Sequence, residues 1–300
     1  MSKLTTLSDA VAQYVNDGDV LYAAGFTHLI PFAAGHEVIR QGKRDLVLAR
    51  ATPDLIYDQM VAAGCARKVI FSYMGNPGVG SLRIVRRAIE QGKLEWEEYS
   101  HFQMITRLQA GASGLPFLPM NQTGAEDLEK ANPNIKRMKD PYGGNDVITV
   151  PALHPDVAIV HVQRADASGN AHLWGIIGEQ KEAAFAARKV ILTSEEIVDE
   201  SVIRSDPNRT LIPEIVVDAV CHVPFACHPS YAQGYYDRDN ELYLQWDKIS
   251  ESVEQVKSWL DEWVFGVKDR SEYWAKLGEE TRRRLEIAPR YSESINYGRY

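Results

Sequence analysis

The most constraining feature of this sequence is a strict alternation of short apolar runs and amphipathic segments over its first 115 residues or so. Each apolar run is typical of a buried strand, and each segment behind it has apolar residues at helical spacing. The expected strands lie at 19–26, 45–52, 67–75 and 94–100, and the expected helices at 6–19, 31–44, 53–64, 80–93 and 101–111. Such alternation predicts an α/β protein with an open, mainly parallel sheet and helices on both faces.

Residue types at the ends of the segments support the helices. Ser8 is an N-cap candidate for the first helix, and Gly18 lies beyond its last apolar position. The second helix begins with Pro31 and stops at Gly42, the usual asymmetry of a proline start and a glycine stop.

The second half of the chain is less regular. Residues 116–146 are dense in Pro, Gly and Asn, which predicts a long irregular excursion over the ligand-binding edge of the sheet, with one short helix at 125–131. Further strands are expected at 147–153, 156–166, 189–195 and 216–225, a helix at 179–188, and a helical end from about 248 to 280. Because no linker interrupts the chain, we expect a single domain over 1–300, with 248–300 as a C-terminal helical extension.

Charge and cysteine content limit the partners and the compartment. The formal net charge is −8, and an acidic surface argues against a nucleic-acid partner, because phosphate contacts need clustered Lys and Arg. Three cysteines, Cys65, Cys221 and Cys227, without a signal peptide predict a reduced, cytoplasmic protein. The longest apolar stretch, 20–35, is broken by polar residues and proline, so no membrane span is expected.

Four expected strands end in loops that suit ligand binding. The loop FSYMGNPGVGS at 71–81 has the pattern G-x-x-G-x-G, which is neither the dinucleotide fingerprint nor a Walker loop. The simplest interpretation is a tight strand-to-helix turn. The other loops lie at 23–32, 49–54 and 99–103, where Ser100 is placed to cap the next helix. Since parallel strands end at one edge, these loops should gather where open sheets bind ligands. Free N–H groups at the helix start after the 71–81 loop, with the Asn76 amide, suit an anion or an oxyanion.

Metal-binding motifs are weak. The segment CHVPFACH at 221–228 lacks a second Cys-x-x-Cys pair, so no metal site is predicted. Cys221 and His222 alternate on an expected strand, so one of them should face the core. His161 and His172 have no carboxylate at a fixed spacing, which favours structural roles for both.

Nucleophile motifs are absent from the sequence. In TSEEI at 193–197, Ser194 is expected to cap a helix whose first turn holds Glu195 and Glu196, which favours the positive end of the helix dipole. Neither a G-x-S-x-G elbow nor an H-E-x-x-H motif occurs. The chain therefore has ligand-binding loops without a self-evident nucleophile.

Several segments, in this order, resemble a known family. They are SKLTTLSDAVAQYVNDGDVLYAAGF at 2–26, SYMGNPGVGSLRIVRRAIEQGKLEWEEYS at 72–100, AGASGLPFLP at 110–119, PDVAIVHVQRADASGNAHLWG at 155–175, TSEEIV with SVIRSDPNRTLIP at 193–213, and HPSYAQGYYDRDN at 228–240. Over nearly the whole chain the sequence is similar to the α (A) subunits of family I coenzyme A transferases, nearest their glutaconate and 3-oxoadipate branches.

The resemblance implies an open α/β fold, the broad fold of certain sugar-phosphate isomerases, and an obligate β subunit in an α2β2 or larger assembly. In this family the catalytic glutamate lies on the β subunit in a Ser-Glu-Asn-Gly motif, which this chain lacks. The implied reaction is a ping-pong transfer of CoA between an acyl-CoA and a dicarboxylic or oxo acid, through covalent catalysis by that carboxylate. A CoA thioester would be a substrate, and no tightly bound cofactor is expected.

The resemblance also implies which residues line the acid pocket, while no residue of this chain is expected to be catalytic. The substrate-binding candidates are Gly25, Phe26, Thr27, Arg50, Ser72, Gly75, Asn76, Ser100, His101 and Gln103. The family's usual double glycine before Phe is Ala24-Gly25 here. The RATPD sequence at 50–54 replaces the asparagines of the 3-oxoacid branch, which argues against succinate/acetoacetate specificity. Arg50 either pairs with a distal substrate carboxylate or is an exposed strand-end arginine.

Three alternatives remain. One branch of the superfamily contains hydrolases that open a ring of steroid-derived CoA thioesters, and their α subunit contributes a glutamate near the position of Ser100-His101, where this chain has no acid. The second alternative is a non-catalytic binding subunit. The third, a sugar-phosphate isomerase of the same broad fold, lacks support because these loops supply no acid/base pair.

Overall fold

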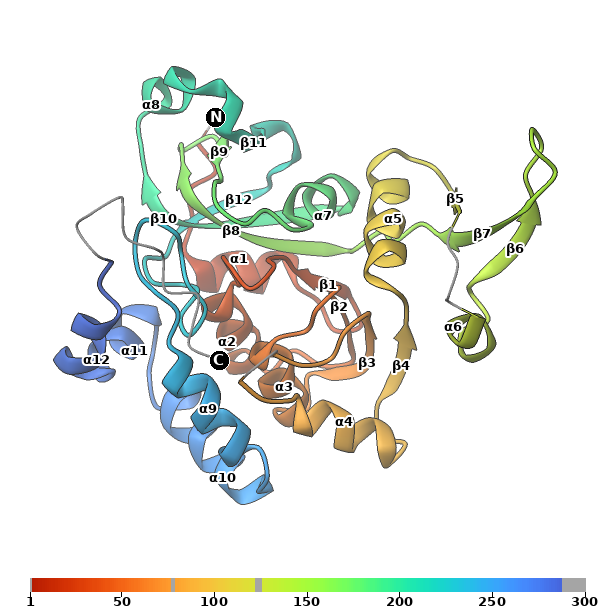
Figure 1. The fold of residues 1–300 in the computed structure, drawn as a ribbon. Helices are drawn as coiled ribbons and strands as arrows, with labels where there is room; N and C mark the ends of the chain where they lie inside the picture. Colours follow the sequence, from red (N-terminus) through yellow and green to blue (C-terminus); the bar gives the residue numbers. More distant parts are fainter. Residues whose placement is uncertain (1, 77–78, 122–125, 288–300) are drawn as a thin grey trace.

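The computed structural model describes residues 2–76, 79–121 and 126–287, and one nine-stranded sheet lies at its centre (Figure 1). Its parallel strands follow the spatial order β12-β10-β8-β1-β2-β3-β4. They are β1 Val20–Ala23, β2 Leu46–Ala49, β3 Ala66–Phe71, β4 Glu95–Glu98, β8 Val157–Ala165, β10 Lys189–Ile197 and β12 Ala219–His222. Two short strands, β9 (Ala171–His172) and β11 (Thr210–Ile212), extend it in antiparallel fashion. The predicted open, mainly parallel sheet is confirmed.

Helices cover both faces of this sheet, because the strand residues are apolar on both sides. Leu21 of β1 belongs to one apolar cluster, together with residues of α1–α4 and α10, and its neighbour Tyr22 belongs to the other, together with residues of α5 and α7. These helices are α1 Leu7–Tyr14, α2 Phe32–Arg40, α3 Leu55–Ala62, α4 Arg83–Glu90, α5 His101–Ala112, α7 Gln180–Ala186 and α10 Val253–Leu260. Continuous apolar runs are typical of parallel strands buried in this way.

Strand β1 lies at the point where the chain changes direction across the sheet. It pairs with β2 on one side and, on the other, with β8, which comes much later in the sequence. In open α/β sheets a ligand crevice forms outside the carboxyl ends of the strands at such a switch point. The loop after β1 is therefore the expected position of a ligand site.

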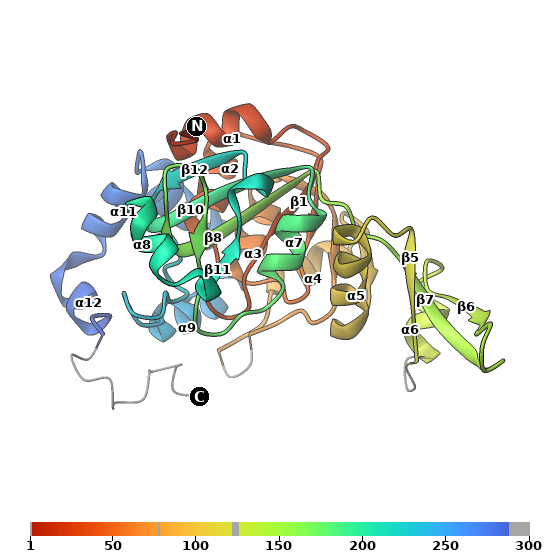
Figure 2. The same cartoon turned by 90° about the horizontal axis from the view of Figure 1, so that it is seen from above.

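The segment 116–146 is not irregular, and this part of the prediction is wrong. It contains β5 (Phe117–Met120), α6 (Glu126–Ala131) and β6 (Lys136–Lys139), and β7 (Asp146–Pro151) completes an antiparallel sheet in the order β5-β7-β6. Figures 1 and 2 show this small sheet standing off the main body beyond α5. The short helix is confirmed over 126–131, whereas residue 125 lies outside the described residues. Proline and glycine lie in the turns and in an edge strand of this segment. Their density concealed the short strands in the sequence pattern.

The C-terminal part is helical, as expected, but begins earlier. Its helices are α9 Asn240–Ile249, α10 Val253–Leu260, a π-helical turn Asp261–Phe265, α11 Arg270–Lys276 and α12 Gly278–Arg284, and residues 288–300 lie outside the described part. Val256 and Leu260 of α10 pack in the same cluster as the first strands. The single-domain organisation stays a prediction. In the described ranges no helix combines the length and apolarity that crossing a membrane requires.

Two predicted helix caps are wrong. Thr6, and not Ser8, accepts the N–H of Asp9 at the start of α1. Ser194 lies inside β10, because Thr193 to Ile197 continue the pairing with β8, and the next helix, α8 (Glu200–Ser205), is capped by Asp199. Tertiary pairing outweighs a local capping preference here. The remaining short helices are 3₁₀ turns at Pro207–Arg209 and Glu214–Val216.

Candidate active site

The loop after β1 has an unusual backbone. Gly25 has φ +137°, and a Cβ there would lie 2.9 Å from the carbonyl oxygens of His28 and Leu29. Thr27 and Leu29 adopt positive φ values of 57° and 55°. Non-glycine residues in this region carry strain, which persists only where surrounding structure holds it and is common at functional sites. Ala24, which stands where the family usually has the first of two glycines, is buried and does not have a positive φ.

Two other strand-end loops, behind β2 and β4, meet this loop. The Phe26 ring packs edge-on against the His101 ring, with 6.1 Å between the centroids. His101, the first residue of α5 behind β4, lies with its Nε2 2.6 Å from the Thr52 hydroxyl behind β2. Burial lowers the pKa of His101 below its ordinary value, so the ring at this junction is neutral near pH 7. An aromatic, a hydroxyl and a neutral imidazole thus form one cluster.

Arg50 is fully buried, so the exposed strand-end alternative is wrong. Its Nη2 donates to the carbonyl oxygen of Gly25, whereas Nε and Nη1 have no hydrogen-bond partner among the described residues. The guanidinium therefore fixes the carbonyl that precedes the strained turn. A buried cation at this edge also favours anions nearby, because charges interact strongly in a low-dielectric region.

The loop at 71–81 is only partly described, since residues 77 and 78 lie outside the described ranges. The Ser72 hydroxyl donates to the carbonyl oxygen of Ala51, which ties this loop to the loop after β2. Asn76 and Gly80 pair through their backbones, and the Asn76 Nδ2 is buried without a partner in the described part of the chain. Gly75 has no positive φ, and an added Cβ would meet nothing closer than 3.6 Å.

The start of α4 is not free for an anion, contrary to expectation. The Ser81 N–H donates to the Asp247 carboxylate, and the N–H groups of Ile84 and Val85 donate to Asp58. Two carboxylates of the protein thus occupy the donors on which a phosphate cradle would depend. Because the carboxylates come from α9 and α3, no residue of the loop itself indicates them.

Ser100 caps α5, as predicted, and forms a reciprocal capping box. Its hydroxyl accepts the Gln103 N–H at 3.1 Å, and the Gln103 Oε1 accepts the Ser100 N–H at 2.9 Å. Gln103 is fully buried, and its Nε2 has no partner in the described ranges. The cap therefore leaves one buried amide donor beside the start of α5.

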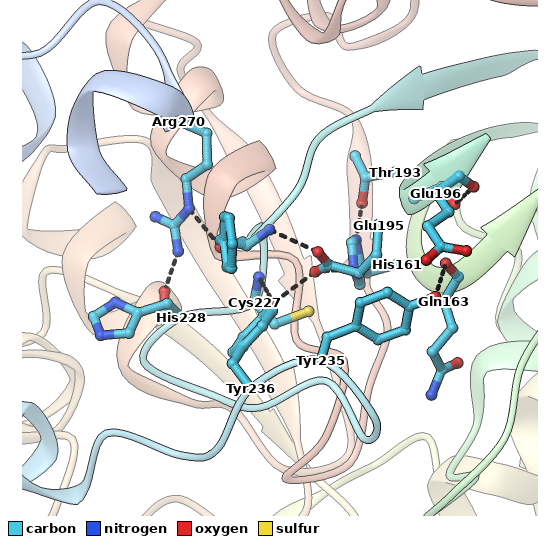
Figure 3. Close-up of polar contacts among 12 residues, drawn as sticks. His161, Gln163, Thr193, Glu195, Glu196, Cys227, His228, Tyr235, Tyr236 and Arg270 are labelled. Atoms are coloured by element: carbon cyan, nitrogen blue, oxygen red, sulfur yellow. Dashed lines mark hydrogen bonds and ion pairs between the residues drawn. The ribbon is translucent and has the colours of Figure 1, made fainter. Parts of the chain in front are cut away.

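A second, buried polar cluster lies between the paired strands β8 and β10 and the segment after β12 (Figure 3). His161 is paired with Glu195, with 2.9 Å between Nε2 and Oε1, and its Nδ1 lies 2.9 Å from the Thr193 hydroxyl. The sequence shows no carboxylate at a fixed spacing from His161, and the fold supplies one from β10. Glu195 also accepts the Tyr236 hydroxyl at 2.7 Å and the Phe225 N–H at 2.7 Å.

This cluster includes donor atoms that could hold a metal. Nitrogen of His161, oxygen of Glu195 and sulfur of Cys227 all lie within 4.8 Å of one another, and all three residues are buried. Hydrogen bonds already satisfy both carboxylate oxygens, and burial raises the pKa of the Cys227 thiol well above its ordinary value, which keeps it protonated. The hydrogen bonds account for the cluster without an ion, and the absence of a metal stays a prediction.

The amino-acid sequence offers little sign of this pair, because its members are 34 residues apart. The only signal is a polar residue within each of two apolar strands, and parallel pairing of Thr193 with His161 places Glu195 two residues further on the same face. On the neighbouring strand β12, Cys221 is buried in the core and His222 is exposed. The prediction that one of these two residues faces the core is confirmed.

A family model described as coenzyme A transferase matches residues 4–222. The chain belongs to the coenzyme A transferase family. The resemblance found in the sequence motifs is thereby confirmed.

Known coenzyme A transferases match the chain over almost its full length. The α (A) subunit of the 3-oxoadipate CoA-transferase of Pseudomonas knackmussii is 51% identical over 282 residues, covering 93% of this chain and 99% of the relative. The α (A) subunit of the glutaconate CoA-transferase of Acidaminococcus fermentans is 37% identical over 307 residues, covering 96% of both chains. The crystal structure of the Acidaminococcus fermentans enzyme superimposes with a TM-score of 0.88 over 96% of both chains.

A solved structure with a different activity also shares the fold. The AibA/AibB decarboxylase is 30% identical, with a TM-score of 0.75 over 87% of this chain and all of that one. The chemistry of a coenzyme A transferase-like chain therefore depends on its site and its partner, and not on the fold.

Proposed function

We propose that this chain is the α subunit of a heteromeric CoA-transferase that moves CoA between an acyl-CoA and a dicarboxylic oxo acid of the 3-oxoadipate class. The convergence of Phe26, Thr52 and His101 around a strained loop carries the proposal, because none of these three side chains is a carboxylate or a thiol that could act as the nucleophile. The 51% identity with the corresponding chain of a 3-oxoadipate CoA-transferase supports the class of acid.

The nucleophile would be a glutamate of the β subunit. Its carboxylate attacks the acyl-CoA carbonyl, CoA leaves as the thiolate, and a mixed anhydride forms. The thiolate then attacks the glutamyl carbonyl, which releases the acid and leaves a glutamyl-CoA thioester. The acceptor carboxylate takes the CoA by the reverse sequence. The absence of a Ser-Glu-Asn-Gly motif from this chain is consistent with this division.

This chain would position the acid and stabilise developing charge. Phe26 and His101 form an edge-on aromatic wall, and the Thr52 hydroxyl and the neutral His101 ring offer hydrogen bonds to a carboxylate or keto group. Asn76 and Gln103 each keep a buried amide N–H group without a partner among the described residues. Positioned donors of this kind stabilise an oxyanion strongly in a water-poor site.

The test is reconstitution. We expect this chain, co-purified with a β subunit, to transfer CoA from succinyl-CoA to 3-oxoadipate, and neither of the two chains to do so by itself. Absence of exchange with every acid pair tried would contradict the proposal. Release of free CoA without an acceptor would indicate the hydrolase, and release of CO₂ a decarboxylase.

A non-catalytic binding role predicts a different result. In that case Asn76→Ala and Gln103→Ala would leave turnover by the complex unchanged. The proposal predicts that each lowers kcat by about tenfold or more, since removing one oxyanion donor typically costs at least that much.

A further inference from the structure

The loop after β1 contains strained residues that neighbouring segments support. Thr27 and Leu29 have positive φ, a backbone region that is unfavourable for non-glycine residues and persists only where the surroundings hold it, and Gly25 in the same loop also has a positive φ. Arg50 holds only the first carbonyl of this loop. The remaining support must come from another segment.

That support comes from residues 224–236, much later in the chain. The Leu29 N–H donates to the Tyr231 carbonyl at 3.0 Å, and the Ser230 hydroxyl donates to the Thr27 carbonyl at 2.7 Å. The Ala33 N–H, at the start of α2, donates to the Ala226 carbonyl at 2.9 Å. The strained loop is therefore built against residues 224–236.

His28 is the side chain that joins the two segments. The Gln233 N–H donates to its Nε2 at 3.0 Å, so the ring proton lies on Nδ1, which donates to the Ile176 carbonyl at 3.1 Å. The ring is fully buried and packs on the Tyr231 ring. A Cβ on Gly175 would lie 2.9 Å from the His28 ring, so this glycine permits the close approach.

Residues 224–236 are themselves fixed by Glu195. One carboxylate oxygen accepts the Phe225 N–H near the beginning of the segment, and the other accepts the Tyr236 hydroxyl at its end (Figure 3). The same hydroxyl accepts the Cys227 N–H. His161 orients the carboxylate from β8, so that one buried side chain closes both ends of the segment.

We propose that Glu195 and His28 are positioning residues: Glu195 fixes residues 224–236, and His28 transmits that geometry to the loop that presents Phe26 and Thr27. Neither residue is a catalytic residue, because both are buried and their polar atoms are engaged within the chain. The structural coupling between the two segments does not depend on the proposed function. Only the expected loss of CoA-transfer activity in the variants rests on it.

Hydrogen–deuterium exchange of the full-length protein tests the coupling without any assumption about activity. We expect Glu195→Gln, which leaves at least one buried donor unpaired, to speed exchange about tenfold or more in peptides covering both 224–236 and 26–33. Faster exchange in 224–236 with no change in 26–33 would overturn the proposal.

His28 offers a matched pair of substitutions. Gln places an acceptor near the Nε2 position and can keep the Gln233 N–H paired, whereas Asn matches Nδ1 and leaves that N–H unpaired. We expect His28→Asn to speed exchange in 26–33 more than His28→Gln does. The reverse order, or equal effects, would contradict the transmitting role.

A buried histidine elsewhere separates positioning from general stability. His36 on α2 is also buried and hydrogen-bonded, to Gln59, and its ring lies edge-on to the Phe32 ring with 6.3 Å between the centroids, but its side chain makes no hydrogen bond to either segment in the described structure. His36→Gln should lower stability without the paired change in exchange. The same exchange pattern from His36→Gln would show that the coupling is nothing more than global destabilisation.

Kinetics of the complex complete the test. With succinyl-CoA and 3-oxoadipate, Glu195→Gln and His28→Asn should lower kcat/KM for the acid by about tenfold or more, and His28→Gln should recover part of it. Wild-type transfer with unchanged kcat/KM in the variants would refute positioning and leave the function intact. Coupled exchange in a protein that transfers no CoA would refute the function and leave the coupling intact.

Discussion

At the scale of single residues, the role of a side chain in this protein depends on its three-dimensional contacts as well as on its position in the sequence. The Ser100 cap follows from residues three positions apart and was predictable. Arg50, by contrast, is typical of an exposed residue at a strand end, yet its side chain is fully buried and its guanidinium donates to the Gly25 carbonyl. The His161–Glu195 pair was missed for the same reason, since its partners meet only through strand pairing.

His101 gives the sharpest test of the site at this scale. His101→Ala removes the contacts with Phe26 and Thr52, so we expect kcat/KM for the acid to fall about tenfold in the assembled enzyme. The exposed His154, before β8, is the matched control, and His154→Ala should behave as wild type. Steady-state kinetics that do not distinguish the two variants would place His101 outside the site.

Substitution of Gly25 tests whether the crowded backbone of the loop after β1 requires glycine. Gly25→Ala places a methyl group 2.9 Å from two backbone carbonyls at φ +137°, so we expect it to lower the free energy of unfolding by about 3 kcal/mol. Gly42→Ala is the control, because it also has a positive φ but meets nothing within 4 Å, and should cost about 1 kcal/mol. Equal losses in urea unfolding would show that crowding at Gly25 is unimportant.

At the scale of helices and strands, long-range order was predictable where each segment is continuous and apolar. The alternation of strands and helices in the first 115 residues predicted the parallel sheet, since its strands are buried on both faces. The segment 116–146 escaped prediction because β6 is exposed throughout and β5 largely so. Without a buried face of regular period, a short strand leaves no apolar pattern.

Asp58 is expected to stabilise the start of α4. Asp58 accepts the N–H groups of Ile84 and Val85 and the indole N–H of Trp246 from a fully buried position. Asp58→Ala leaves these donors unpaired, so we expect about 3 kcal/mol less stability in denaturant titrations. Asp17→Ala, which removes one exposed cap of the Arg44 N–H, should cost under about 1 kcal/mol. Similar losses would contradict the role given to Asp58.

At the scale of the whole molecule, buried neutral histidines couple stability to pH. Burial lowers the pKa of His28 and of His228 to about 4, and that of His36 well below its ordinary value. Their unfolded value is about 6.5, so the stability that they contribute is fully present above pH 6.5 and is lost as the pH falls through 4.

We therefore expect the free energy of unfolding to fall between pH 7 and pH 4, by up to about 3 kcal/mol for each of His28 and His228. Comparing wild type with His28→Gln isolates one group, because the carboxylates titrate alike in both proteins. The variant should lose less stability on acidification than wild type does. Parallel curves for the two proteins would show that His28 is not held neutral.

The central claim is that this chain shapes and polarises the site while another chain supplies the attacking carboxylate. Trapping with borohydride or hydroxylamine during turnover with succinyl-CoA, followed by mass spectrometry of both subunits, tests it most directly. We predict a modification on one glutamate of the β subunit, with none on this chain. A modified residue in this chain would contradict the account.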